Sequence, residues 1–463
     1  MRKQGCYMWN RFGFGAAVLL VLALMFTPEA SRAAEIVVGP NAGDPIAAGF
    51  QLKVALENLK AGDALTILDG EYTLPGGVKV GGLRPNGQFK RIDGWIDKVT
   101  RIKAANRRKA KIRGNLELRG SFFRIEGLII KGARGNNDRP GIEIVDSHNV
   151  EIVDNEVAYC GGGGINFNQS DMILITQNTV HDNGTRNSDQ HSGISVYQPV
   201  NYRTNPREQH WGVRITRNIC HSNRNEVPTG GGNLTDGNGI AVDDTKYTQS
   251  RYLSKYNLEN IRIDTALNAG NKRLPYNLPI LVEGNLCYFN GGSGIQCFEA
   301  VDVKIKNNTC VGNRQRTRYN GRYFNLGQIS LQNSKNCEVC NCVMQSLKVK
   351  LSPTGACYAA SEINETENSG GNRWYNNLLH ATTGGLKSAL RNDPNIDEEA
   401  IYEDPKFVAL VRGKYNFRAV NGNNRGVTWG GGHEYVDLLG RTVSGEIKTD
   451  LGAIQTMDSP ATK

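Results

Sequence analysis

The sequence predicts an all-β fold, a right-handed parallel β-helix solenoid with coils of about 23 residues and two long lateral insertions. Two recurring phrases lead to this prediction. The first is a short apolar-alternating run that ends in Asn, and it recurs at Asn155, Asn178, Asn218, Asn285 and Asn308. The second is a Gly-Ile pair that opens a short strand, and it recurs at Gly141, Gly164, Gly193, Gly239 and Gly294.

The spacing of these phrases explains why the units must stack. In each series the first gap is 23 residues, which leaves room for two or three short strands and for no long helix. Such a unit cannot bury its own hydrophobic face, so successive coils pile up, each advancing by about 4.8 Å. The Asn side chains then hydrogen-bond from coil to coil in the turns, and the crossover is right-handed. Inward aliphatic columns are expected from Ile152, Val153, Ile175, Ile215, Val282 and Ile305.

The chain resembles the right-handed parallel β-helix superfamily of pectate lyases, alginate lyases, chondroitinase B and mannuronan epimerases. Besides the repeats, the segment GDALTILDGEYTL, Gly62 to Leu74, is similar to the N-terminal capping segment of secreted members. The runs Asp404 to Phe407, Tyr415 to Phe417 and Asp450 to Ala453 are similar to their C-terminal end. The resemblance covers most of the chain and specifies the fold more strongly than the reaction.

The N-terminal segment predicts export. An apolar run from Ala16 to Phe26 follows a basic stretch, is too short to span a bilayer, and precedes small residues at Ser31, Ala33 and Ala34. We therefore predict that residues 1–33 are a signal peptide, that the protein has no membrane span, and that it is secreted or periplasmic.

The rest of the chain is predicted to form one domain. Residues 34–455 form the β-helix, with an N-terminal cap and first coils at 34–115, central coils at 116–390 and a C-terminal cap at 391–455. A tail follows at 456–463. Insertions at 197–211 and 245–280 break the period and are rich in Tyr, Arg and Lys. Solenoids carry such insertions on a binding face, and the alternative is that both pack on the solenoid as inert flaps.

Composition and charge indicate the kind of partner. A chain of 463 residues with 39% hydrophobic residues is too apolar to be disordered. Its formal charge is +10, and about +7 remains without the signal peptide, which carries four basic residues and one acidic residue. A basic exported protein favours an acidic partner, and the candidates are a uronate polysaccharide, an anionic cell surface and nucleic acid, although mild positive charge also serves solubility. The basic run Arg107 to Arg113 lacks interleaved aromatic residues, so we expect no nucleic-acid partner. We also expect a monomer.

The cysteines are predicted to be core residues. Nine of the ten remain after the signal peptide, and Cys220, Cys287 and Cys310 stand where earlier coils carry Val157 and Val180. A Cys that alternates with Val is a small buried side chain. The three cysteines between 337 and 342 lack the further ligands of a zinc site.

Aligning the Gly-Ile strands shows which side chains share the outer face. The third residue after Ile is Val145, Asn168, Tyr197, Asp243 or Phe298. The fourth lies at the turn and is Asp146, Gln169, Gln198, Asp244 or Glu299. Crowded carboxylates repel one another unless a cation lies among them, and calcium accepts six to eight oxygen ligands. We therefore predict a Ca²⁺ site formed by Asp236, Asp243, Asp244 and Glu299. The alternative is that these acids are solvated turn residues or pair with Lys246 and Arg251.

The residues beside this cluster supply candidate catalytic and substrate-binding groups. In the alignment His191 lies one coil from Asp236. A base is needed to take a proton beside a sugar carboxylate, and the candidates, with the first preferred, are Lys246, His191 and Tyr247. The candidate substrate-binding residues are Arg203, Arg251, Lys255, Tyr197 and Trp211. Each could instead be a solvated or packed loop residue.

The acidic pair also resembles the calcium site of family nine polysaccharide lyases, in which clustered Asp residues bind the metal and a Lys is the base. Asp236, Asp243, Asp244 and, loosely, Lys246 match, and Lys246 lies closer in sequence to the acids than that family's pattern. The resemblance implies calcium-assisted cleavage of a uronate-containing polysaccharide by β-elimination. A glycoside hydrolase, a C5-epimerase and a non-catalytic carbohydrate-binding or envelope-surface solenoid remain open on the same scaffold.

Overall fold

The computed structural model describes residues 33–132, 138–201, 211–246, 276–315, 327–347, 349–350, 357–358, 361–365, 369–381, 400–411, 414–419, 435–438, 442–443 and 452–454. The chain divides into Met1–Arg32, outside the described residues, and Ala33–Lys463, which contains all the elements below. Among the described residues, no helix is both long and apolar enough to cross a membrane.

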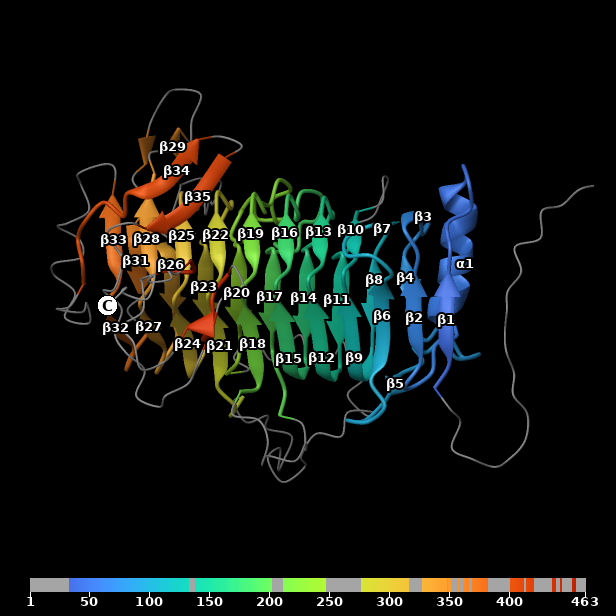
Figure 1. Ribbon diagram of the computed structural model, residues 1–463. Coiled ribbons are helices and arrows are strands. Elements are labelled where there is room, and N and C mark those ends of the chain that lie inside the picture. Colours follow the sequence, from blue (N-terminus) through green and yellow to red (C-terminus); the bar gives the residue numbers. More distant parts are fainter. Residues whose placement is uncertain are drawn as a thin grey trace, which may run out of the picture. The chain divides into compact units, whose positions relative to one another are not determined.

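In the described part of Ala33–Lys463, the strands form three long parallel sheets, here called sheets A, B and C (Figure 1). Sheet A contains β1 (Glu35–Val38), β2 (Ala64–Ile67), β6 (Thr100–Ala104), β9 (Gly120–Glu126), β12 (His148–Val153), β15 (Asp171–Thr176), β18 (Val213–Thr216), β21 (Ile280–Glu283), β24 (Val303–Lys306), β27 (Glu338–Cys340) and β32 (Arg373–Tyr375), with β5 (Ile92–Asp93) beside β9. Sheet B contains β3 (Gly70–Thr73), β7 (Ala110–Arg113), β10 (Ile129–Lys131), β13 (Glu156–Ala158), β16 (Thr179–His181), β19 (Ile219–His221), β22 (Leu286–Tyr288), β25 (Thr309–Val311), β28 (Val343–Ser346) and β33 (Leu378–Ala381). Sheet C contains β4 (Val78–Lys79), β8 (Leu116–Leu118), β11 (Ile142–Val145), β14 (Ile165–Asn168), β17 (Ile194–Tyr197), β20 (Ile240–Asp243), β23 (Ile295–Phe298), β26 (Gly327–Gln332) and β31 (Ser361–Glu365).

The remaining described elements are one helix and short antiparallel pairs. The helix is α1 (Pro45–Glu57). The pairs are β29 (Val349–Lys350) with β30 (Cys357–Tyr358), β34 (Phe407–Val411) with β35 (Lys414–Ala419), and β36 (Tyr435–Val436) with β37 (Thr442–Val443).

The chain visits sheets A, B and C in turn, so each strand pairs with its equivalent in the coils before and after. Ile142 pairs with Ile165, Ile165 with Ile194, and Ile194 with Ile240, which makes these coils 23, 29 and 46 residues long. The predicted fold class, a right-handed parallel β-helix, is therefore confirmed. The register of the Gly-Ile strands is the one that the sequence alignment gave.

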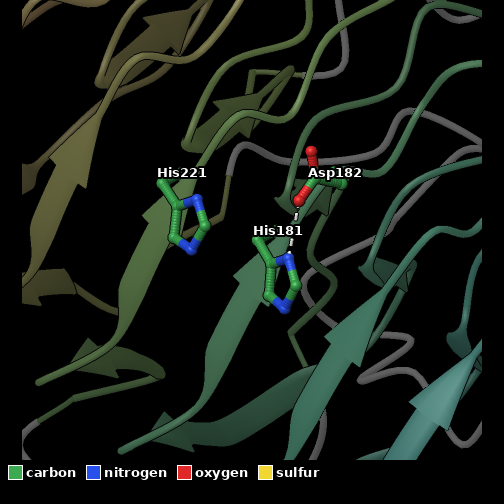
Figure 2. Close-up of side chains that lie close together, drawn as sticks. All are labelled: His181, Asp182 and His221. Atoms are coloured by element: carbon green, nitrogen blue, oxygen red, sulfur yellow. Dashed lines mark hydrogen bonds and ion pairs between the residues drawn. The ribbon is translucent and has the colours of Figure 1, made fainter. Parts of the chain in front are cut away.

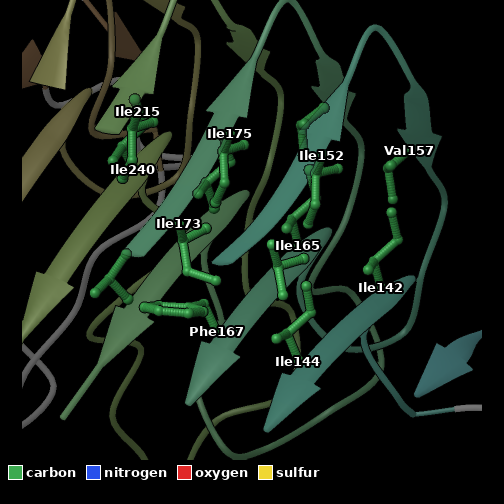
Figure 3. Packing of buried hydrophobic residues seen from close by; sticks show 14 of the residues in the cluster. Ile142, Ile144, Ile152, Val157, Ile165, Phe167, Ile173, Ile175, Ile215 and Ile240 are labelled. Carbon is green, nitrogen blue, oxygen red and sulfur yellow. The ribbon is translucent and has the colours of Figure 1, made fainter. Parts of the chain in front are cut away.

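The core consists of aliphatic columns that run along the inside of the sheets (Figure 3). In sheet A the predicted column is in register and fully buried, and it contains Ile152, Ile175, Ile215, Val282 and Ile305. Val153 differs from the prediction, because successive residues of a strand face opposite sides and it pairs with Thr176 in an outer column.

Two ladders of buried Asn side chains hold the corners. In the predicted ladder, at the corner from sheet A to sheet B, each amide donates to the next Asn at 3.0–3.1 Å, and the members are Asn155, Asn178, Asn218, Asn285 and Asn308. A second ladder, five residues later at the end of the sheet B strands, contains Asn183, Asn223, Asn290 and Asn313. Because all of these amides are buried, their bonds to backbone groups replace hydrogen bonds to water.

The glycine of the Gly-Ile phrase is required by space. A Cβ atom at Gly141 would lie 2.5 Å from Cγ1 of Val157, and one at Gly164 would lie 2.3 Å from Cγ1 of Val180. The start of these sheet C strands therefore packs directly on the inner column of sheet B, which explains why the phrase recurs from coil to coil.

A helix covers the N-terminal end of the solenoid. Helix α1 begins at a capping Asp44, whose carboxylate accepts from the Ile46 and Ala47 amides at 3.0 Å, and it lies at the N-terminal end of the sheets (Figure 1). It buries Leu52 and Leu56. On the outer side of sheet B, Phe407 and Leu438 pack against Leu286 and Val311 as members of one hydrophobic cluster.

The cysteines are buried, as predicted. Eight of them are free thiols in the described residues: Cys160, Cys220, Cys287, Cys297, Cys310, Cys337, Cys340 and Cys342. Cys220, Cys287 and Cys310 pair in register in sheet B, in the column that also contains Val157 and Val180.

Candidate functional site

The outer face of sheet C is polar along its length. The residue after each Ile faces outward, and in successive coils it is Glu143, Asn166, Ser195, Ala241, Gln296 and Ser330. Two long connections leave the C-terminal ends of these strands, one after β17 and one after β20. Both contain residues outside the described part of the chain, 202–210 and 247–275.

His191 and Asp236 lie on adjacent coils at the N-terminal edge of this face. The amide of Gly237 donates to the His191 carbonyl at 2.9 Å, so Asp236 is next to the residue that contacts His191. The neighbouring pair is also joined, since the Thr235 amide donates to the Gln190 side chain at 2.9 Å. The proximity of His191 to Asp236 was predicted from the alignment.

Amide side chains connect these two residues to the rest of the face. Nδ2 of Asn166 lies 2.9 Å from Nδ1 of His191. Nδ2 of Asn238 donates to the Asp236 carboxylate at 3.1 Å and to Oε1 of Gln296 at 2.5 Å. The row from Asn166 to Gln296 therefore spans several coils and places an imidazole and a carboxyl among hydrogen-bonding groups.

Burial shifts the pKa of each group in the direction that favours its uncharged form. It lowers the pKa of the His191 imidazole, although the charge of Asp189 opposes this. Burial raises the pKa of the Asp236 carboxyl to about 7, although the hydrogen bond from Asn238 opposes this. The Nε2 atom of His191 is buried and has no hydrogen-bond partner among the described residues. With Asn166 donating to Nδ1, the ring proton is on Nε2, so His191 is a neutral donor beside a carboxyl that exchanges its proton near neutral pH.

Further along sheet C the face carries charged groups. Glu117 is within 3.2–3.6 Å of cationic groups of Lys79, Arg119 and Arg139. Burial and the charge of Glu117 raise the pKa of Glu143, while the three cations oppose this. This end of the face therefore presents basic side chains close to the row of amides.

The four predicted calcium ligands do not come together. Asp236 precedes β20, whereas Asp243 is its last residue and Asp244 lies in the following turn, so the extended strand separates the first carboxylate from the others. The turn residues Asp244 and Glu299 have left-handed backbone, with φ of 50° at each. Asp244 is buried and accepts from Nε2 of Gln198 at 2.6 Å. Calcium needs its oxygens within about 2.3–2.6 Å of one ion, so these four residues as placed do not fit a single calcium ion.

The structure places Lys246 away from His191 and Asp236. Its ammonium donates to the carbonyl of Asn333 in a turn at the C-terminal end of sheet C. Burial, then the charge of Lys335, lowers the pKa of Lys246, and Cys337 and Glu299 oppose this. A nearby positive charge thus helps to lower the pKa of Lys246, but this residue lies at the opposite end of the sheet C strands from His191 and Asp236.

Trp211 and Tyr197, two of the predicted substrate-binding residues, lie at different sheets. The ammonium groups of Lys304 and Lys306 lie 5.8 and 5.9 Å from the centre of a Trp211 ring, so the indole packs against β24 of sheet A. Tyr197 is in register with Asp243 on sheet C. The other predicted residues, Tyr247, Arg203, Arg251 and Lys255, lie outside the described residues.

Asn166, Asn238 and Gln296 were not among the predicted residues. They stand one residue after, or one residue before, the Gly-Ile pairs. An alignment that compared these positions, as well as the third and fourth residues after Ile, would have placed the three amides on one row.

No protein-family model and no curated protein sequence matches the chain. Several solved structures are similar to it. Pectate lyase Pel9A is 11% identical over 93% of this chain and 98% of its own, with a TM-score of 0.43. An alginate lyase from Paenibacillus sp. strain FPU-7 is 14% identical over 75% of this chain and 93% of its own, with a TM-score of 0.38. The A-module of the Azotobacter vinelandii mannuronan C-5 epimerase AlgE4 is 15% identical over 78% of this chain and 93% of its own, with a TM-score of 0.34. At these values the comparison concerns the scaffold, and the three sheets of the chain itself establish that the scaffold is a parallel β-helix.

Proposed function

We propose that the protein is a polysaccharide lyase that cleaves a uronate-containing polysaccharide by β-elimination, with His191 and Asp236 as its proton-handling pair. One observation carries the proposal: a buried neutral imidazole and a carboxyl with a pKa of about 7 lie on adjacent coils of the outer face of sheet C. Groups with such shifted pKa values are concentrated at functional sites.

The pair can meet the demands of elimination. The ionised Asp236 takes the proton from the carbon beside the sugar carboxylate, and the electron pair of that bond forms the new double bond as the glycosidic oxygen leaves. The Nε2 atom of His191 is buried in the free protein, so the imidazole must turn toward the substrate before its Nε2–H group donates to the negative charge that develops on the sugar carboxylate. Asp236 then returns its proton to the departing oxygen, so no other reactant is required.

The charge of the protein supports an acidic substrate. The chain keeps a net charge of about +7 without its predicted signal peptide. Lys79, Arg119 and Arg139 lie at one end of the same face, where guanidinium groups can hold uronate carboxylates. Export, predicted from the N-terminal segment, would bring the protein to such polymers.

The proposal is tested by incubating the purified protein with pectate, alginate and glycosaminoglycans and recording the ultraviolet absorbance of the unsaturated uronate. We expect a signal with one polymer class, and a loss of at least about 100-fold in turnover in Asp236→Asn and in His191→Gln. The matched controls are Asp97→Asn, in an exposed turn, and His148→Gln, on sheet A, and both should retain turnover. Full turnover in either test variant would contradict the assignment.

The same assay tests the residues predicted from the sequence. Lys246→Met and Tyr247→Phe should retain turnover if Asp236 is the base. Treatment with a chelator tests calcium: activity that disappears and returns with calcium, together with its loss in Asp243→Ala, would move the reaction to the C-terminal end of sheet C and make Lys246 the base.

Other products would identify the other candidate functions. New reducing ends without ultraviolet absorbance indicate a hydrolase, and changed uronate stereochemistry in an intact polymer indicates an epimerase. Saturable binding without any product indicates a carbohydrate-binding solenoid. Each of these results would overturn the lyase proposal.

A further inference from the structure

A ladder of aromatic rings runs across the outer face of sheet B, away from the candidate site on sheet C. The rings of His181 and His221 stack with centres 4.8 Å apart and planes 7° apart, and His221 stacks on Tyr288 at 4.7 Å. Tyr159 and Phe289 approach the ends of the stack edge-on. Only two of its five rings carry nitrogen atoms, and these two are neighbours.

A carboxylate lies beside the two imidazoles (Figure 2). His181 and His221 are paired in register on β16 and β19. Oδ2 of Asp182 is 2.8 Å from Nδ1 of His181, and Nδ1 of His221 is 3.2 Å from the Ser222 hydroxyl at the equivalent turn of the next coil. Ligand atoms of His181, Asp182 and His221 all lie within 4.8 Å of one another.

We propose that His181, Asp182 and His221 bind a divalent transition-metal ion such as Zn²⁺ through the two Nδ1 atoms and the Asp182 carboxylate. Two imidazoles and a carboxylate suit zinc, nickel, cobalt or copper, whereas calcium takes oxygen ligands alone. Solvent reaches the group, since the side chains of His181 and Asp182 are 14% and 32% exposed. Water can therefore complete the coordination.

Binding requires the stacked rings to turn. Two nitrogens bound to one tetrahedral ion at about 2.0–2.1 Å lie roughly 3.3 Å apart, and each ion–nitrogen bond lies in the plane of its ring. Parallel planes separated by the stacking distance cannot both contain the ion, so the imidazoles must rotate toward each other about their side-chain bonds. This gives up the stacking of the two rings, which is weaker than the two metal–nitrogen bonds that replace it. The backbone needs no change, because the sheet already holds the two residues one strand spacing apart.

The experiment uses untagged, chelator-treated protein titrated with Zn²⁺ by calorimetry and with Cu²⁺ by electron paramagnetic resonance. We expect one ion per chain and a copper signal with two coupled nitrogens. His181→Phe and His221→Phe keep an aromatic ring in the stack, and each should reduce the coupled nitrogens to one and weaken Zn²⁺ binding at least tenfold. Asp182→Asn should weaken binding and keep two nitrogens.

His148→Phe is the matched control, because His148 has an edge-on aromatic neighbour, Phe122, on sheet A and no place in the proposed group. It should bind both ions as the parent protein does. The proposal fails if the parent protein binds no stoichiometric ion, if the Phe variants at 181 and 221 bind like the parent, or if His148→Phe removes the site. Circular dichroism of each variant establishes that a loss of binding is not a loss of fold. The result is independent of the lyase assay.

Discussion

Asp236 is a residue whose chemistry works against the stability of the fold. Burial raises the pKa of its carboxyl from 3.8 to about 7. In the unfolded chain the carboxyl ionises near pH 4, so between pH 4 and 7 the unfolded state loses its proton first and the folded state becomes relatively less stable. Above pH 7 the penalty is complete and constant. Residues that carry such a cost are expected at sites selected for function.

Asp236→Asn should therefore stabilise the protein at pH 8 and have little effect at pH 4. The gain cannot exceed about 4 kcal/mol, at about 1.36 kcal/mol per pH unit, and partial solvent exposure makes it smaller. Thermal unfolding of the parent and variant at both pH values measures it, with Asp97→Asn as the surface control. A variant that is less stable than the parent at pH 8 would show that the charged carboxylate stabilises the fold. The proposed function requires that Asp236→Asn be more stable than the parent at pH 8 and also lose turnover.

The activity of the parent protein should rise with pH through about 7, because the proposed base acts in its ionised form. Initial rates between pH 5 and 9 at saturating polymer give the apparent pKa. A rate that is flat across this range, or that falls, would exclude Asp236 as the base. Burial lowers the pKa of the His191 imidazole, so any ionisation of His191 should act on the acid side of its ordinary range, below the rise caused by Asp236.

At this scale the sequence predicts neighbours better than it predicts ligand geometry. The proximity of His191 to Asp236 was predictable because both residues precede a Gly-Ile pair by two or three positions, and these pairs are in register on adjacent coils. The predicted calcium cluster rested on the closeness in sequence of Asp236 and Asp243. Asp243 is the last residue of the extended strand β20, and Asp236 lies before its first residue, so the two carboxylates are at opposite ends of the strand. The turn residue Asp244 is drawn inward to Gln198 by its left-handed backbone, which the sequence pattern did not reveal.

Among the elements, the Asn ladder stabilises the corner from sheet A to sheet B. Oδ1 of Asn178 accepts from the backbone N–H of Asn155 at 2.9 Å. Nδ2 of Asn178 donates to the carbonyls of Ile152 and Thr176 at 2.9 and 3.0 Å. All of these groups are buried, so a shorter side chain would leave them without partners.

Asn178→Ala should cost on the order of 3–5 kcal/mol, since each orphaned buried group costs about 1–3 kcal/mol. Urea unfolding followed by circular dichroism measures the loss. Asn86→Ala, in an exposed turn, is the control and should change stability by less than about 0.5 kcal/mol. A similarly small loss at Asn178 would mean that water can enter the corner.

The cysteine column of sheet B is a packing element. Cys287 is fully buried between Cys220 and Cys310, in the column that also contains Val157 and Val180. Val is therefore compatible with this position, whereas a hydroxyl would be buried among apolar groups.

Cys287→Val should cost less than about 1.5 kcal/mol, and Cys287→Ser should cost about 1–3 kcal/mol more than Val does. The comparison is made by urea unfolding under reducing conditions. Equal stability of the Val and Ser variants would contradict a purely apolar role for the column and would point to a polar neighbour of the thiol.

For the whole molecule, the N-terminal helix decides whether the first coils stay ordered. Leu52 of α1 is fully buried over the end of the core, and Val54 of the same helix is 60% exposed. In a solenoid each coil is stabilised by its immediate neighbours, so loss of a cap is felt first by the adjacent strands.

Leu52→Ala should destabilise the protein by about 2–5 kcal/mol, and Val54→Ala should change stability by less than about 0.5 kcal/mol. Hydrogen exchange should show faster exchange in β1 and β2 than in β14 and β17 for the Leu52 variant. Uniform acceleration along all three sheets would mean that the solenoid unfolds as one cooperative unit.

The repeating part of the fold was predictable because each sequence phrase occurs five times. An alignment of the five occurrences shows which positions are buried even where one of them differs. Helix α1 was not predicted, although the capping Asp44, the following Pro45 and the spacing of Ala48, Leu52 and Leu56 signal it. It occurs once, before the repeats begin, and so the period carries no information about it. The second Asn ladder was also missed, although its members stand five residues after those of the first.

The corner from sheet A to sheet B has a further consequence for how this protein can change over evolution. From β9 to β33 the two sheets are joined by two residues in every described coil, whereas the connections from β19 to β20 and from β17 to β18 are many residues long. An insertion at the short corner would cut the ladder from Asn155 to Asn308, whereas the long connection from β19 to β20 follows Asn223 of the second ladder and leaves both ladders whole. New loops, and with them new specificities, can therefore be acquired along two edges of the solenoid. The edge between sheets A and B tolerates no insertion and keeps its two-residue connection.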